Sequence, residues 1–154
     1  RPYMRARQQL AEEYRVSGRL EEAVLEYNEM LALNENDNQG VRYELLPCLL
    51  ALDRLEDARK LMQRFEDDCT FSVVFTWCRV LERHLSGDPA GAKDALVVAR
   101  KQNSHMEAYL KGHRKPPKNL PSSYAAGSKE EAVIYADALL LAWRKHPGAL
   151  AACT

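Results

Sequence analysis

Apolar residues recur along most of the chain at spacings of three and four positions, which is typical of helices with one buried face. In the stretch 20–31, for example, the apolar positions are separated by a polar face that carries several glutamates. Polar stretches such as 34–38 interrupt the pattern, because asparagine and aspartate favour turns and helix ends. The pattern predicts helices over residues 2–17, 20–31, 38–52, 53–65, 71–86, 89–102, 106–110 and 128–146.

One of these helices covers a run that local preference alone would assign to a strand. Residues 71–77 are rich in phenylalanine, valine and threonine, which favour strands. Beyond Trp77, however, the spacing of three and four continues through Val80, Leu81 and Leu85. The periodicity therefore favours a helix over this run.

Three polar residues mark predicted helix starts. Asp53 and Ser128 each precede a glutamate by three positions, which is the spacing of a capping box. Asp88 precedes Pro89, and proline is well suited to the first position of a helix. We therefore expect helices to begin directly after all three residues.

A turn residue stands five positions before an alanine three times, at Gly18, Asp53 and Gly87. The interval is about 34 residues, which is the period of a repeated helix pair. One such pair cannot bury its apolar faces alone, so neighbouring pairs stack. We expect a single all-α domain over residues 1–154, with repeats over about 4–37, 38–70 and 71–104, and an irregular unit over 105–148 whose long last helix caps the open end.

The residues of these repeats resemble those of the tetratricopeptide repeat (TPR) family. That family places leucine, a small residue and tyrosine in the first helix of each unit, then alanine and phenylalanine in the second. The resemblance covers roughly residues 4–104, and Arg7 replaces the family's tryptophan. The matching residues are Leu10, Ala11, Tyr14, Ala23 and Tyr27 in the first unit, Leu45, Ala58 and Met62 in the second, and Ala92 and Leu96 in the third.

The resemblance implies a TPR-like α-solenoid, a right-handed superhelical array of antiparallel helix pairs. In that family the first helices line a concave groove that holds a peptide or a partner helix. The residues that this geometry places in the groove are Arg5, Gln8, Glu12, Arg15, Tyr43, Trp77, Leu81 and His84. The alternative is that the charged residues form a solvated face and that Trp77 lies in the core. Some family members grip a partner's terminal carboxylate with lysine and asparagine. The corresponding positions here hold Gln8, Glu12 and Glu44, which would repel it.

The composition is that of one globular domain with a continuous core, since 46% of the 154 residues are hydrophobic and 29% are charged. The 22 Lys and Arg residues balance the 22 Asp and Glu residues, so no overall field attracts nucleic acid or an anionic membrane. No apolar run approaches the ~20 residues that a membrane span needs.

The ends and the cysteines of the chain bear on its location. The chain begins with Arg1 and not with methionine, so we expect a segment of a longer protein. The four cysteines are widely and unequally spaced, without the clustering of a disulfide framework or a zinc site. Reduced thiols in a cytoplasmic protein are the expected state.

Residues 111–118 form a basic, proline-containing loop. Its lysines and arginine would suit an acidic partner or a phosphate. The alternative is a solvated loop, folded back on the array through Leu120 and Tyr124.

Catalytic motifs are missing from the sequence. The four histidines are scattered, and there is no glycine-rich phosphate loop or nucleophile elbow. We therefore expect no enzyme, no cofactor and no metal site. The expected function is a non-catalytic protein–protein interaction module, such as a scaffold or adaptor, whose partner is a protein or peptide. The alternative is a structural spacer or an oligomerisation arm, with the chain itself as a possible partner.

Overall fold

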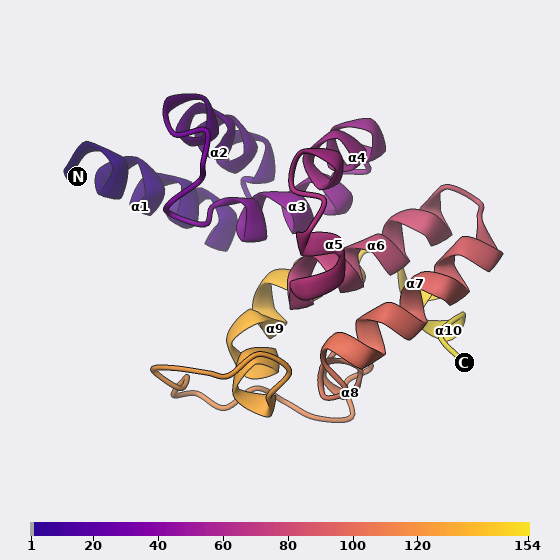
Figure 1. Cartoon of the computed structure of the whole chain (residues 1–154). Helices are drawn as coiled ribbons and strands as arrows, with labels where there is room; N and C mark the ends of the chain where they lie inside the picture. Colours follow the sequence, from indigo (N-terminus) through magenta and orange to yellow (C-terminus); the bar gives the residue numbers. More distant parts are fainter. Residues whose placement is uncertain (1) are drawn as a thin grey trace.

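The computed structural model describes residues 2–154, and all regular secondary structure in that range is helical (Figure 1). The all-α prediction is therefore confirmed, and the strand-like run that contains Trp77 is helical from Val73, although Ser72 is extended and interrupts the predicted helix. The helices are α1 (Pro2–Val16), α2 (Leu20–Leu33), α3 (Arg42–Ala51), α4 (Leu55–Arg64), α5 (Asp68–Phe71), α6 (Val73–Leu85), α7 (Pro89–Gln102), α8 (Met106–Leu110), α9 (Lys129–Trp143) and α10 (Pro147–Ala151).

Three pairs of consecutive helices pack on each other: α1 on α2, α3 on α4 and α6 on α7. Neighbouring pairs are joined through contacts of α3 with α2 and α6, and of α4 with α6. Short turns connect the helices within each pair, which makes them antiparallel neighbours. The small residues Ala23 and Ala58, fully buried in the second helices, allow the close approach of paired helices.

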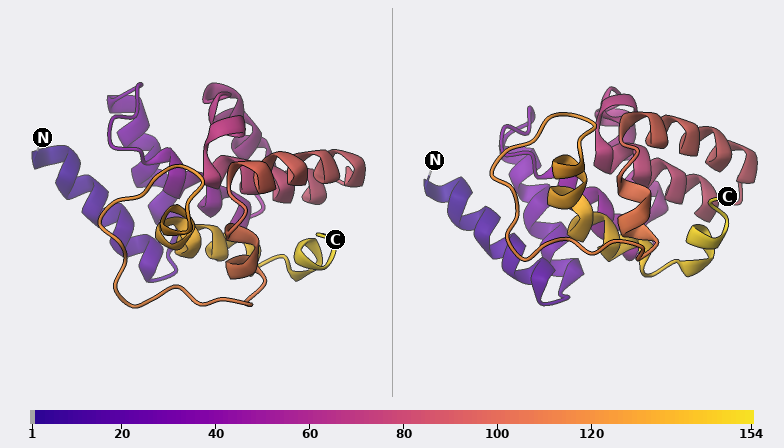
Figure 2. Two further views of the ribbon diagram at one scale, coloured as in Figure 1. Left: turned by 60° about the horizontal axis from the view of Figure 1, so that its bottom comes forward. Right: turned by 90° about the horizontal axis from the view of Figure 1, so that it is seen from below.

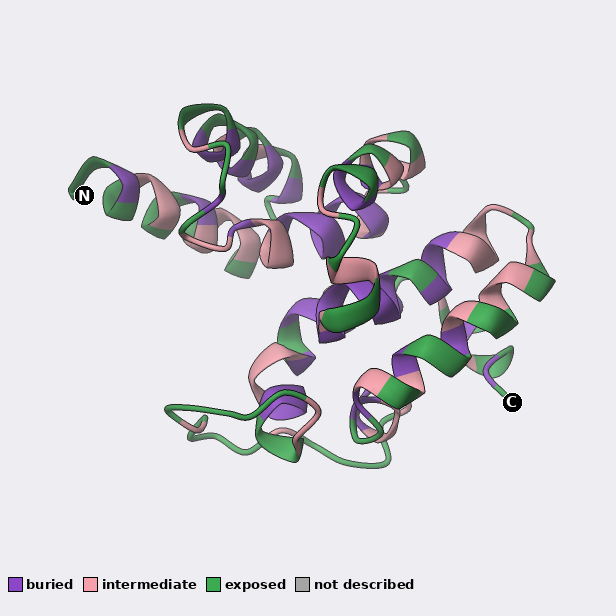
Figure 3. Cartoon of the chain, viewed as in Figure 1, coloured by how far each residue is buried: buried purple, intermediate pink, exposed green. Residues whose placement is uncertain are grey.

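The sequence predicted that the long last helix, α9, caps the open end of the stacked helix pairs, but α9 lies elsewhere. It packs on α3, α6 and α8, so it covers one side of the first helices of the second and third pairs (Figure 1). Just beyond its end, Nε2 of His146 lies 3.1 Å from the carbonyl oxygen of Leu50, at the far end of α3. Buried residues accordingly concentrate on α3, α6 and α9 (Figure 3).

Side-chain caps form at three helix starts, two of them predicted. The Ser128 hydroxyl accepts a hydrogen bond from the backbone N–H of Glu131, and the Asp88 carboxylate accepts one from Gly91. The third cap is Ser72, which begins α6 by accepting from the N–H of Phe75. Each cap satisfies a backbone donor that has no partner inside its helix.

Two predicted helix starts were wrong: the helices predicted from residues 38 and 53 begin at Arg42 and Leu55. In both cases an aspartate just before the helix takes a left-handed backbone conformation. Asp37 has φ 52° and Asp53 has φ 59°, a region that aspartate tolerates better than most residues. Asp53 therefore belongs to the turn before α4, and the helix starts at Leu55 without a side-chain cap. Buried Asp37 instead turns back on α3, where its carboxylate accepts hydrogen bonds from the backbone N–H groups of Val41 and Arg42, at 2.9 and 3.0 Å.

Candidate functional site

The four residues predicted for the first helix share one side of α1, because they are spaced by three and four positions. Arg5 is exposed, and Gln8, Glu12 and Arg15 are half-buried. Their row continues onto α3 through an ion pair between Arg15 and Glu44. We call the surface formed by Arg5, Gln8, Glu12, Arg15, Tyr43 and Glu44 the α1–α3 face.

Arg15 is the centre of the charges on this face. Its guanidinium is bidentate on Glu12, with Nε 3.2 Å from one carboxylate oxygen, and the same Nε lies 3.3 Å from Oε2 of Glu44. The Tyr27 hydroxyl on α2 donates a hydrogen bond to Glu12, at 3.3 Å. The Arg15 side chain is only 14% exposed, so this pairing is partly shielded from water.

The carboxylates outnumber the cation at this point. Burial raises the pKa of the Glu44 carboxyl, and the nearby charges of Glu12 and of Asp137 on α9 raise it further, while Arg15 acts in the opposite direction. Oε2 of Glu44 makes no hydrogen bond in the described part of the chain. Close to Arg15, negative charge therefore exceeds positive charge, and Glu12, whose side chain is 45% exposed, is the carboxylate that a partner can reach.

Tyr43 sits at the α3 end of the face and is held by its neighbours. Its hydroxyl accepts from Arg42 at 2.7 Å and donates to Asp68 at 3.1 Å. Its ring packs edge-on against Phe75 and against Tyr135 of α9, with centroid distances of 5.8 and 6.2 Å. Burial, with Asp68 next in effect, raises the pKa of Tyr43 to about 12. Only part of the ring remains available to a partner.

The α6 part of the predicted groove is covered by the chain itself. Trp77 is 1% exposed and packs edge-on against Trp143 of α9, at 6.3 Å between centroids, and Leu81 is fully buried. The prediction that these two residues contact a partner was therefore wrong for this structure, and the core alternative for Trp77 is correct. His84 is half-buried and lines a separate recess of about 580 Å³, which is formed by α6, α7 and the C-terminal segment and includes no residue of α1 or α3.

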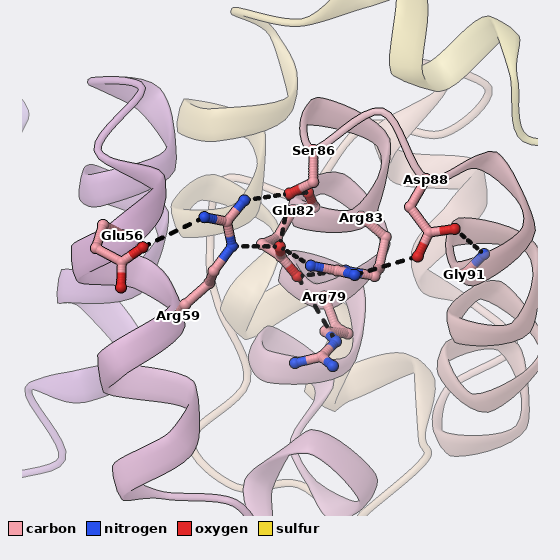
Figure 4. A network of polar contacts seen from close by, with 8 residues as sticks. All are labelled: Glu56, Arg59, Arg79, Glu82, Arg83, Ser86, Asp88 and Gly91. Atoms are coloured by element: carbon pink, nitrogen blue, oxygen red, sulfur yellow. Dashed lines mark hydrogen bonds and ion pairs between the residues drawn. The ribbon is translucent and has the colours of Figure 1, made fainter.

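The sequence prediction missed a buried ion-pair network between α4 and α6. The Glu82 side chain is completely buried and accepts hydrogen bonds from Arg59 at 3.0 Å, from Arg83 at 2.6 and 2.9 Å, and from the Ser86 hydroxyl at 2.8 Å (Figure 4). Arg79 approaches to 3.7 Å. Burial alone would raise the pKa of Glu82, but the hydrogen bonds from Arg83, Ser86 and Arg59 outweigh it and hold the pKa at about 2.

A signal for this network is present in the sequence. Glu82 follows Val74 and Cys78 at intervals of four, so it lies in register with the buried stripe of α6. A charge at such a position requires a partner, and arginines stand nearby on α4 and α6. The arginines around Glu82 line an open cleft of about 750 Å³ between α4, α6 and α7. Because they are committed to Glu82 and Asp88, the network links helices and does not form a free cation site.

Within residues 2–154, no group of histidine, cysteine and carboxylate side chains is arranged to hold a metal ion. No helix in the same range has both the length and the apolar character needed to cross a bilayer. Comparison of the chain with protein-family models, with curated proteins and with solved structures gave no match.

Proposed function

We propose that this protein is a non-catalytic protein–protein interaction module, built as a short TPR-like array, that binds a peptide or partner helix on the α1–α3 face. The proposal depends on one observation: α9 covers the first helices of the second and third pairs but not α1, the first helix of the first pair. Helix α9 packs on α3 and α6, whereas α1 packs chiefly on α2 and keeps a row of polar side chains at the surface. A few anchors on such a row can supply most of the affinity for a partner.

The charge of the face defines the chemistry of the partner. Around Arg15 the carboxylates of Glu12 and Glu44 outnumber the guanidinium, and Asp137 adds negative charge near Glu44, while Arg5 lies exposed near the start of α1. A lysine or arginine of the partner would relieve this imbalance and could pair with Glu12, whose side chain is 45% exposed. A partner's terminal carboxylate would be repelled by the same groups.

Charge reversal on α1 tests this proposal. Peptides selected from a random display library against the whole chain should include a class with basic residues. Glu12→Lys should weaken their binding about tenfold, or ~1.4 kcal/mol, because an attractive charge becomes repulsive. The measurement is isothermal titration calorimetry of the selected peptides with the wild-type chain and with the variant.

The matched control is Glu13→Lys, which makes the same charge change at an exposed neighbouring position turned by about 100° around α1 from Glu12. Circular dichroism melts of both variants establish that each is folded. Equal binding of the basic peptides to the wild-type chain and to both variants, or a selection that yields no basic peptide, would contradict docking on this face.

A second function, as a structural spacer or oligomerisation arm, is favoured by the end of the array at α1 and α2. Tyr3 and Leu33 are both 58% exposed there and line one recess of about 670 Å³. Exposed apolar side chains that share a recess are typical of contact surfaces.

Analytical ultracentrifugation over a range of concentrations tests this second function. Self-association that Leu33→Ser abolishes would support it, whereas the exposed control Leu25→Ser should leave the association unchanged. A monomer at every concentration would leave the spacer role without support from this surface.

A further inference from the structure

The chain from Lys111 to Lys129 contains lysine, arginine and histidine but no aspartate or glutamate. Because the whole chain has no net charge, the remaining residues carry a matching excess of acid. This segment is therefore locally basic, and it forms a wide arc around the start of α9 (Figure 2). This segment plays no part in the α1–α3 face.

The segment frames a recess of about 560 Å³ against α8 and α9. Its rim carries the exposed cations Arg114, Lys115 and Lys129, with Glu130 as the one acidic lining residue. Apolar side chains form part of its walls, and they include Leu120, which is 51% exposed, and the buried Val133. The recess thus combines positive charge at the rim with an apolar interior.

The segment is anchored at several points. The backbone N–H groups of His113 and Arg114 donate to the carbonyl oxygen of Ala108, at 2.8 and 3.2 Å. Further along, the hydroxyls of Tyr124 and Tyr135 are 2.9 Å apart, and the two rings pack edge-on. Its prolines restrict the backbone between these anchors. A recess held in this way loses less conformational entropy when it binds a ligand.

The cations of the recess have no acidic partner among residues 2–154. Arg114, Lys115 and Lys129 form no ion pair there, and neither does neighbouring Lys118. Elsewhere in the chain, buried and half-buried arginines such as those around Glu82 are paired with carboxylates. The charge at the recess is consequently available to a ligand.

We propose that this recess binds an acidic peptide segment of a partner protein, with carboxylates on the cationic rim and an apolar side chain against Leu120 and Val133. The complementarity of charge and the apolar walls both favour a peptide. A nucleic acid or a membrane surface would instead require a broader basic field, which the electrically balanced chain does not provide. The proposal is independent of the function assigned to the α1–α3 face.

The test uses a fluorescein-labelled peptide of glutamate with leucine at every fourth position, titrated with the whole chain and followed by fluorescence anisotropy at low salt. We expect saturable binding that weakens as salt rises. Each exposed contact contributes only part of the affinity, so the three cations are reversed together. The variant R114E/K115E/K129E should weaken binding about tenfold or more, because three attractive charges become repulsive. Leu120→Ser, or serine in place of the peptide's leucines, should weaken it about threefold or more.

The matched control is K60E/K101E/K145E, which makes the same change in net charge at exposed lysines outside the recess and should retain binding. Equal losses in the two triple variants, or unchanged binding in the recess variant, would overturn the proposal. It would also be overturned if vesicles containing phosphatidylserine, or an oligothymidine strand, bind at the recess while the peptide does not. Peptide binding that survives in Glu12→Lys would show that this site stands apart from the α1–α3 face.

Discussion

Replacement of Trp143 by alanine is expected to lower the free energy of unfolding by about 3–5 kcal/mol. Trp143 is fully buried on α9, and its ring packs edge-on against that of Trp77 on α6. The substitution removes this contact and leaves a cavity between the two helices. Because domains are stable by only about 5–15 kcal/mol, the variant should be close to unfolding.

Urea unfolding followed by circular dichroism measures the loss. The control Phe71→Ala removes an aromatic ring that is 73% exposed and should change stability by less than about 1 kcal/mol. Trp143→Phe, which keeps a ring at the site, should recover part of the loss. If Trp143→Ala costs no more than the exposed control, α9 does not hold the second and third helix pairs together.

Replacement of Glu82 by alanine is expected to cost about 3 kcal/mol near neutral pH, because it leaves the arginines of a buried ion pair without their acceptor. The value lies at the low end of the range for such losses, since Arg59 and Arg83 are partly exposed and can reach water. Glu82→Gln keeps the volume but not the charge and should lose about 2 kcal/mol.

The effect of Glu82 should depend on pH in a defined direction. Its folded-state pKa of about 2 lies below the ordinary value of 4.5, so its contribution is complete above pH 4.5 and is lost as the pH falls toward 2. Glu107 behaves in the same way: hydrogen bonds from Arg100 and Lys111 outweigh burial and hold its pKa at about 2. The wild-type chain should therefore lose stability in acid over this window.

Urea titrations at a series of pH values between neutral and acid measure this dependence. In Glu82→Gln the loss of stability below pH 4.5 should be smaller than in the wild-type chain, because the contribution of Glu82 is removed while that of Glu107 remains. The control Glu35→Gln changes an exposed carboxylate outside this network, and its pH dependence should match the wild type. Identical acid profiles for Glu82→Gln and the wild-type chain would contradict the assigned role of the network.

Local features of this fold could be predicted from the sequence. The caps at Asp88 and Ser128 depend on residues three positions apart, and the apolar spacing overrode the strand preference of residues 71–77. The left-handed conformation of Asp53 was missed because the same residue type also favours helix caps. The place of α9 was missed for a different reason: the spacing within one helix does not say which distant helix it covers.

The candidate site also has a part that could be predicted from helical spacing and a part that depends on contacts between distant helices. The row of Arg5, Gln8, Glu12 and Arg15 on one side of α1 follows from helical spacing, so its geometry was accessible from the sequence. The burial of Trp77 depends on a helix from the other end of the chain. A clue was nevertheless present in α9, which is apolar on nearly every side, and such helices are usually enclosed by neighbours.

The path of α9 also affects how the chain can reach its native state. His146 meets Leu50 across a long stretch of sequence, so this contact closes a large loop late in folding. During synthesis the helix pairs emerge before α9, and the apolar sides of α3 and α6 remain exposed to solvent until α9 has left the ribosome. The nascent chain thus passes through an incompletely folded state that exposes apolar surface. In this state a chaperone would bind to α3 and α6, the two helices that α9 later covers.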